Sequence, residues 1–390
     1  MAHLWDSQMP MAIEPKATSV RLNRRDWLSQ AAIAGLSPWL AGTALASQTA
    51  SPTNTLIASW QSPNSNHIGL IDVDASQWRI SRSLALPTRA HGLAVEGSGS
   101  VLALARRPGD WLLRWQPSTG KTQWQWIEGD RQFNGHVESS PQGDTLWTTE
   151  TNLETAQGLL GVRERNSLKK IAEWSTQGMD PHALLVLPQS LGQIPAGSLI
   201  VANGGIPTLP ETGRVKRGLD RMDASLIALN PHTGAVLGQW RLADPFLSIR
   251  HLAWDPVSRR LGIALQAEHL DSAQRLAAPV LAVWNGEQLL PATAQPSLRG
   301  YGGDICALPG GGFAVSCPRA DTLALFTSAA VWRQNQPHRQ VCALTEQRNQ
   351  LWASGQDGVL SMTTPPTISV VSSAANAERL QFDNHWLNFN

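Results

Sequence analysis

The stretch that decides the fold lies between residues 91 and 127, where four short apolar runs follow one another: HGLAV (91–95), SVLALA (100–105), WLLRW (111–115) and KTQWQWI (121–127). Gly, Pro, Asp and Ser residues separate these runs. Short runs rich in Val, Leu and Trp between turn residues are typical of an all-β protein. We therefore expect this stretch to form one antiparallel unit of four strands.

The same unit recurs along the chain. Later units open at HVESS (136–140), HALLVL (182–187), HLAWD (251–255), DICALP (304–309) and QVCALT (340–345). Three strands before residue 87 form an incomplete unit, and we expect its missing strand from the C-terminal residues 379–382 (RLQF). Radial repetition of this kind protects the edges of sheets. The sequence thus predicts an all-β, seven-bladed β-propeller over residues 47–390, closed by the C-terminal strand. Two β-sandwiches are less favoured because no linker-like change in composition divides the chain.

The first 46 residues have the pattern of an export signal. The sequence NRRDWL (23–28) matches a twin-arginine signature, an apolar stretch follows over residues 27–45, and Ala44-Leu45-Ala46 is typical of a cleavage site. No second apolar run of about 18 residues follows. We therefore expect residues 1–46 to be a twin-arginine signal peptide, and the mature protein to be periplasmic without a membrane anchor.

The composition narrows the partners and the chemistry. The chain has 31 Lys and Arg against 30 Asp and Glu and no basic run, which argues against nucleic acid or an anionic membrane as a partner. Most of the 17 Trp residues are expected to fill space between sheets. No CxxC pair occurs, so a zinc ribbon and c-type haem attachment are unsupported. Cys306 and Cys317 flank a turn and are expected either as a disulfide or as two buried thiols, and Cys342 is the third cysteine.

Four histidines open the first strand of successive units: His91, His136, His182 and His251. In a propeller this strand lines the central channel, and the loops that enter it share a face with the loops between the second and third strands. We therefore expect one site on this face. Its predicted ligand-binding residues are His91, Arg106, Arg107, His136, Glu150, His182, Asn203, Arg250, His251, Gln266 and Arg319. We assign no role to His67, His232, His269, His338 and His385.

The residue types at this site suit three kinds of chemistry. Neutral imidazoles, with His136, His182 and His251 as the predicted metal ligands, could hold iron, copper or zinc. The arginines could clamp an anionic ligand, and Glu150 with a histidine could act as an acid–base pair. The insertion 203–222, rich in Gly, Pro and Arg, is expected to overhang the channel as a lid.

Several motifs resemble the exported domain-of-unknown-function 1513 family. These are RQFNGH (131–136), Thr149-Glu150, Pro181-His182, VANGGI (201–206), Gly213-Arg214, Met222, LSIRHLA (247–253), Tyr301-Gly302 and SCPR (316–319). The resemblance implies a periplasmic seven-bladed propeller of unestablished activity, often linked to iron-acquisition proteins. The chain departs from the family pattern at Ala183, Leu209 and Gly218, where the family usually has Glu, His and Asn. This member is therefore expected to bind its ligand differently or more weakly if those residues are ligands in its relatives.

The favoured hypothesis is a periplasmic propeller that binds a metal ion, or a small metal-bearing or anionic ligand, on the histidine face. Its partners would be that ligand and periplasmic iron-acquisition proteins. Two alternatives remain open from the sequence. One is a propeller enzyme, either a metal-dependent hydrolase with Glu150 as base or an oxidoreductase. The other is a protein-interaction platform whose histidines are structural.

Overall fold

The computed structural model describes residues 54–74, 77–127, 129–207, 218–363, 367–373 and 380–389. All of these lie in one unit, Thr49–Asn390. The predicted signal peptide, residues 1–46, lies outside the described residues, as do residues 208–217 of the predicted lid. Within the described part of the chain, no helix is long and apolar enough to cross a membrane.

The described chain is an all-β structure, as the sequence predicted. Five sheets contain four antiparallel strands each, and consecutive strands lie side by side in each sheet. Their strands are β4 (Ala90–Val95), β5 (Val101–Ala105), β6 (Trp111–Gln116), β7 (Lys121–Trp126), β8 (Arg131–Ser139), β9 (Thr145–Asn152), β10 (Gln157–Glu164), β11 (Lys170–Met179), β12 (Pro181–Val186), β13 (Leu199–Asn203), β14 (Ser225–Leu229), β15 (Val236–Trp240), β16 (Leu247–Asp255), β17 (Arg260–Ala267), β18 (Leu281–Trp284), β19 (Leu289–Pro291), β20 (Ile305–Ala307), β21 (Phe313–Cys317), β22 (Thr322–Phe326) and β23 (Trp332–Pro337).

The two ends of the described chain meet in a set of eight strands. Their order is β1-β2-β3-β27-β26-β25-β24-β28. The strands are β1 (Asn54–Ser62), β2 (Ser65–Val73), β3 (Gln77–Leu86), β24 (Leu344–Gln347), β25 (Gln350–Gly355), β26 (Gly358–Thr363), β27 (Ile368–Ser373) and β28 (Gln381–Asn388). The C-terminal strand β28 pairs antiparallel with β1, whereas only one residue pair joins it to β24. The C-terminal strand β28 therefore lies beside β1, the first strand of the described chain.

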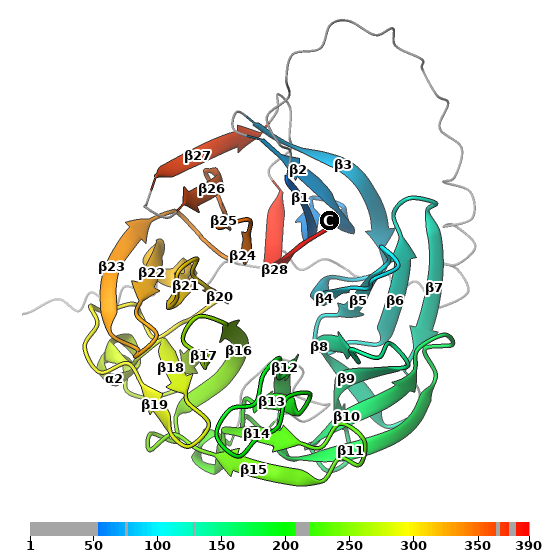
Figure 1. The fold of residues 1–390 in the computed structure, drawn as a ribbon, viewed down its shortest axis with the longest axis horizontal. Helices are drawn as coiled ribbons and strands as arrows, with labels where there is room; N and C mark the ends of the chain where they lie inside the picture. The colour runs from blue at the N-terminus through cyan, green and yellow to red at the C-terminus, as the bar shows by residue number, and fades with distance from the viewer. Residues whose placement is uncertain are drawn as a thin grey trace, which may run out of the picture. The chain divides into compact units, whose positions relative to one another are not determined.

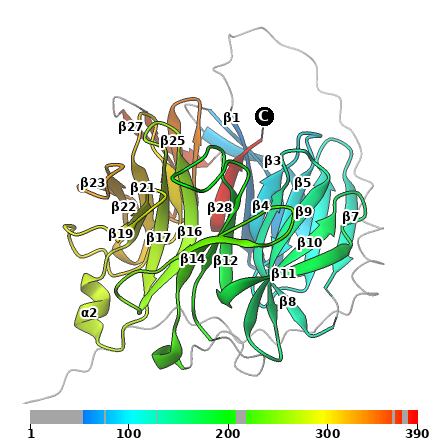
Figure 2. The ribbon, with the colours of Figure 1, turned by 60° about the horizontal axis from the view of Figure 1, so that its bottom comes forward.

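The first strand of each sheet lies nearest to a common centre, together with β28 (Figure 1). These inner strands are β4, β8, β12, β16, β20, β24 and β28. The short helices, α2 (Ser272–Ala277), η2 (Leu219–Arg221) and η3 (Pro318–Ala320), interrupt loops between strands. Helix α2 lies at the periphery, away from the inner strands (Figures 1 and 2). Helix α2 therefore does not cover the centre where the inner strands meet.

Apolar packing between neighbouring sheets holds the arrangement together. One hydrophobic cluster joins Leu102 of β5 to Phe133 of β8, and another joins Trp147 of β9 to Val201 of β13. A further cluster contains Trp386 of β28 and Trp352 of β25, both almost fully buried. Trp124, Trp126, Trp174 and Trp240 pack against such clusters as well. This confirms the prediction that large indole rings fill the space between sheets.

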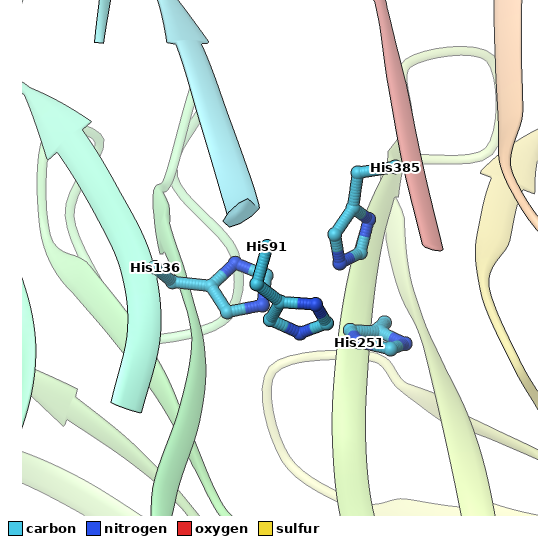
Figure 3. Close-up of side chains that lie close together, drawn as sticks. All are labelled: His91, His136, His251 and His385. Atoms are coloured by element: carbon cyan, nitrogen blue, oxygen red, sulfur yellow. The ribbon is translucent and has the colours of Figure 1, made fainter. Parts of the chain in front are cut away.

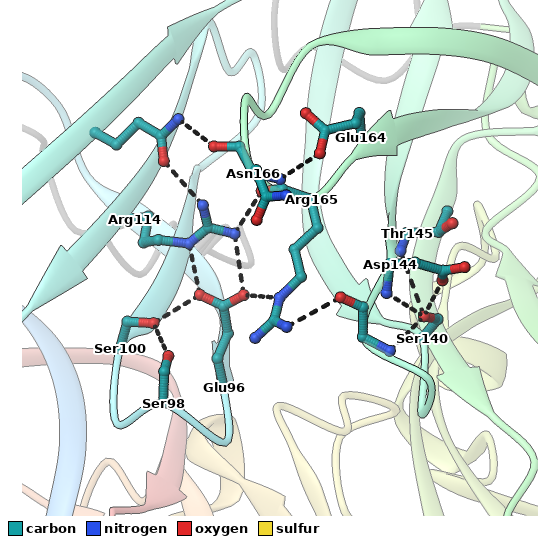
Figure 4. Close-up of polar contacts among 12 residues, drawn as sticks. Glu96, Ser98, Ser100, Arg114, Ser140, Asp144, Thr145, Glu164, Arg165 and Asn166 are labelled. Carbon is teal, nitrogen blue, oxygen red and sulfur yellow. Dashed lines mark hydrogen bonds and ion pairs between the residues drawn. The ribbon is translucent and has the colours of Figure 1, made fainter.

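A polar network ties the sheet β4–β7 to the sheet β8–β11 beyond the ends of β4 and β10 (Figure 4). The Glu96 carboxylate accepts hydrogen bonds from Arg114 at 2.6 and 3.0 Å and from Arg165 at 2.9 Å. The Ser100 hydroxyl donates a further bond at 2.7 Å. Burial alone would raise the pKa of Glu96, but these hydrogen bonds outweigh it and lower the pKa below its ordinary value.

All three cysteines are free thiols. Burial raises the pKa of Cys306 and of Cys317 well above its ordinary value, so both thiols stay protonated at neutral pH. Of the two expected alternatives for Cys306 and Cys317, the structure therefore contains the pair of thiols.

Trp386→Ala tests the role of β28 in closing the sheet. Trp386 is 1% exposed within its cluster, so its removal leaves a cavity and should lower the free energy of unfolding by about 3–5 kcal/mol. Trp332→Ala, on the outer strand β23, is the matched control and should cost less, because Trp332 is only partly buried. Equal losses in urea-induced unfolding would contradict this role of β28.

Glu96→Gln should destabilise the fold by about 1.5–3 kcal/mol at pH 7, because hydrogen bonds to a charged group are lost. Since the pKa of Glu96 is lowered from 4.5 on folding, its stabilising effect is complete above that value and disappears as the pH falls through the folded pKa. The difference between wild type and variant should therefore stay constant down to about pH 4.5 and shrink as the pH falls below that value. The exposed Glu287→Gln serves as control, and a pH-independent difference would refute the argument.

Candidate metal and anion site

Five imidazole rings meet at the centre of the inner strands. They belong to the four predicted histidines and to His385 of β28, and their ring centroids lie 4.5–5.8 Å apart in nine pairs. Figure 3 shows four of them pointing toward one another from separate strands. One ring nitrogen from each of His91, His136, His251 and His385 lies within 4.8 Å of the others. The predicted convergence of the histidines is therefore present in the structure.

A β-bulge places each of these histidines. The inner strand has extra residues opposite its partner strand at five places, between residues 90 and 93, 133 and 137, 181 and 184, 249 and 252, and 382 and 386. Each interval contains one of the five histidines. A bulge bends the strand and re-aims a side chain that would otherwise follow the alternation of the sheet. The repetition of one bulge in five sheets explains why the rings share one centre.

The backbone packs tightly around this centre. Gly135 has a φ of +111°, and a Cβ atom there would lie 2.7 Å from the Cδ2 atom of His91. Glycine is therefore required at this position, both for the backbone conformation and for the close approach of the His91 ring.

Burial keeps four of these imidazoles neutral. Desolvation lowers the pKa of His91 to about 3 and holds the pKa values of His136, His182 and His251 well below 6.5. The Nε2 atom of His182 lies 2.8 Å from that of His251 and 3.3 Å from that of His91. Neutral imidazole is the form that binds metal ions.

Several buried ring nitrogens in this cluster have no hydrogen-bond partner among the described residues. They include Nε2 of His136, Nε2 of His385 and Nδ1 of His251. A buried polar atom without a partner costs about 1–3 kcal/mol. The unpaired nitrogens therefore destabilise the folded protein, and a metal ion bound to them would remove this cost.

Two carboxylates stand behind the rings, on the side away from the centre. The Nδ1 atom of His385 lies 3.2 Å from Asp304, and that of His91 lies 3.8 Å from Asp383. Burial would raise the pKa of Asp383, but His91, Arg106 and Arg89 hold it below its ordinary value. Carboxylates in this position commonly orient metal-binding histidines and increase their basicity.

A cavity of about 250 Å³ opens beside the histidines, at the ends of the strands that carry the entering loops. Its wall contains most of the predicted binding residues. The lining residues are His91, Arg106, Arg107, Asn134, His182, Arg250, His251, Gln266, Tyr301, Arg319 and Asn384. A larger hollow of about 490 Å³ lies beyond the opposite ends of β4 and β8, but no histidine lines it. The smaller cavity is therefore the candidate site.

Three predicted residues do not line this cavity. His136 lies in the histidine cluster beside it, whereas Glu150 and Asn203 lie elsewhere. Glu150 was expected in a loop, but β9 continues to Asn152, so Glu150 lies within the sheet. There its carboxylate pairs with Arg163 at 2.6 Å and Lys170 at 3.1 Å. Asn203 ends β13, and its amide donates to the Thr176 carbonyl at 2.8 Å. Both side chains thus serve contacts between strands, and the expected co-location is wrong for both.

Three residues of the site were missed by sequence reasoning. His385 was assigned no role because the C-terminal strand was expected to end at Phe382, whereas β28 continues to Asn388. Asp180 and Asp383 were missed because they pair with arginines that are distant in sequence, such as Arg250 and Arg106, and no local pattern reveals such pairs. Asp180 is fully buried and accepts hydrogen bonds from both Arg107 and Arg250, the latter at 2.8 Å. The sequence did contain a signal for His385. This histidine lies directly after residues 379–382, the segment expected to pair with the N-terminal strands.

The comparison with known families now bears on this site. Residues 84–389 match the family described as "Protein of unknown function (DUF1513)". The chain belongs to this family. The matched range contains all five clustered histidines and all the arginines of the cavity wall. No curated protein matches the chain.

Solved structures similar to this DUF1513 protein are β-propeller-like. Virginiamycin B lyase from Staphylococcus aureus has a TM-score of 0.53 at 11% identity, covering 76% of this chain and 91% of its own. A functionally unknown protein from Desulfotomaculum acetoxidans has a TM-score of 0.54 at 11% identity, covering 85% of this chain and 99% of its own. At such identities the likeness concerns the fold alone.

Asp180→Asn tests the electrostatics of the cavity wall. Asparagine tolerates the left-handed backbone that Asp180 adopts, with a φ of 53°, but removes the charge that Arg107 and Arg250 share. We expect a loss of about 3 kcal/mol in unfolding free energy, typical of a broken buried ion pair. Asp244→Asn, whose pair with His269 is partly exposed, should change stability by less than 1 kcal/mol. Similar losses for the two variants would contradict the assignment.

Proposed function

We propose that this DUF1513 protein is a seven-bladed propeller that binds a transition-metal ion through the histidines at its centre. The observation that carries the proposal is the group of four imidazole nitrogens within 4.8 Å of one another. Their ligand type suits iron, copper or zinc. The ligand set proposed here is His91, His136, His251 and His385. It replaces the predicted set of His136, His182 and His251, because the group of nitrogens within 4.8 Å of one another includes His91 and His385 but not His182.

The blade count is supported by the packing of the sheets. Seven hydrophobic clusters occur in the described chain, and each combines residues of two neighbouring sheets. The set of eight strands divides into β28-β1-β2-β3 and β24-β25-β26-β27, each antiparallel throughout. These two groups and the five four-stranded sheets make seven blades, with β28 as the closing strand.

Binding is favoured over hydrolysis because the base expected for hydrolysis is not at the site. Glu150 is fully buried and paired with Arg163 and Lys170. No carboxylate is among the described residues that line the cavity. We further propose that the protein works in the periplasm and in iron acquisition. That part of the proposal is supported by the signal-like sequence of residues 1–46 and by the family resemblance.

Metal content after purification without a His tag tests the proposal. Wild type loaded with Fe²⁺, Cu²⁺ or Zn²⁺ and then desalted should retain about one ion per chain for at least one of these metals. The double substitution His136→Ala and His251→Ala should abolish retention, because it removes half of the proposed ligands. His232→Ala, an exposed histidine outside the cluster, should behave as wild type. Circular dichroism checks that the variants fold. No retained metal in folded wild type would refute the proposal.

A further inference from the structure

The cavity beside the histidines has an excess of positive charge. Arg106, Arg107, Arg250 and Arg319 line it, and Arg89 lies behind it. Asp180 pairs with Arg107 and Arg250, Asp383 pairs with Arg89 and Arg106, and Glu268 acts on Arg107 at longer range. Asp304, behind His385, is a fourth carboxylate. Five guanidinium groups thus stand against four carboxylates, an excess of one positive charge.

Two of these guanidinium groups have unused donors. Among the described residues, the Arg319 guanidinium contacts only the ring of Tyr301, with 4.1 Å between its Cζ atom and the ring centroid. Stacking on an aromatic ring fixes the plane of an arginine and leaves its N–H groups available. The Nε atom of Arg250 is buried without a hydrogen-bond partner, although Arg250 is only 3% exposed. The buried Nε atom of Arg250 requires an acceptor that the described residues do not provide, and the exposed N–H groups of Arg319 are available to a ligand that enters from solvent.

A metal ion would increase this positive charge. Its proposed ligands are neutral imidazoles, which do not offset the charge of a divalent cation. The cavity wall adjoins the same rings, because His91 and His251 belong to both the metal group and the cavity lining. An anion in the cavity would therefore contact the arginines and lie next to the metal. The cavity volume of about 250 Å³ equals roughly eight water molecules, which limits the anion to a small molecule.

We propose that this cavity binds a small oxyanion, bearing carboxylate or phosphate groups, through Arg250 and Arg319. A planar guanidinium can donate two parallel hydrogen bonds to either group. The inference rests on the proposed function in one respect only: the oxyanion would also complete the coordination of the histidine-bound metal. The arginine contacts themselves do not depend on the metal.

Isothermal titration with citrate and with inorganic phosphate tests the proposal. The wild-type protein should bind at least one of these probes, and the probe that binds distinguishes a carboxylate from a phosphate ligand. Arg319→Gln should weaken binding at least tenfold, because it removes hydrogen bonds to a charged group that are worth about 1.5–3 kcal/mol. Arg319→Lys should give a smaller loss, since lysine keeps the positive charge but cannot donate the two parallel hydrogen bonds of a guanidinium. Arg333→Gln, on the exposed face of β23, changes net charge equally and should leave binding unchanged.

Failure of this inference can be told apart from failure of the proposed function. Metal content is measured on the same samples, and Arg319→Gln should keep its metal. Oxyanion binding that needs Arg319 in a protein without metal would support the cavity and refute the metal site. Absence of binding by both probes, or equal binding by Arg319→Gln and wild type, would overturn the oxyanion proposal. The unfolding temperatures of the variants verify that each remains folded.

Discussion

Each sheet of this protein can bury its two faces only against its neighbours, and the rest of the structure depends on that constraint. The hydrophobic clusters lie between adjacent sheets, with Trp147, Trp352 and Trp386 among the largest buried side chains. Such packing brings the inner strands toward one centre. The two ends of the described chain must then meet, and the pairing of β28 with β1 satisfies this requirement. His385 reaches the centre as a consequence of that pairing.

The histidine site lies where the inner strands converge, and β-bulges in these strands create it. A bulge at one position of five inner strands turns a histidine toward the centre, so the cost of desolvating five imidazoles is concentrated at one point. Hydrogen bonds among the rings offset part of that cost, as between His182 and His251. Within the described part of the chain, ring nitrogens of His136 and His385 have no hydrogen-bond partner. The wall of arginines above them is held in place by Asp180 and Asp383, which are almost fully buried.

The fold could be predicted from the sequence because its signals are local and repeated. Short apolar runs separated by turn residues indicate strands, and the repetition of His91, His136, His182 and His251 at one position indicates a common face. The errors arose where a strand boundary decided the direction of a side chain. Extending β9 by a few residues moves Glu150 from a loop into a sheet, and extending β28 moves His385 into the site. Propensity alone does not fix such boundaries.

The ion pairs behind the cavity are a different case. Asp180 and Asp383 act on arginines that are distant in sequence, such as Arg250 and Arg106, and no local pattern reveals such pairs. These pairs form only because the fold brings the inner strands side by side.

The direct test of the central claim is X-ray absorption spectroscopy of the protein loaded with Zn²⁺. The histidine site predicts a first shell of nitrogen or oxygen atoms at about 2.0–2.1 Å, with the multiple scattering of several imidazole rings. A hydrated ion, or a shell without imidazole scattering, would contradict it.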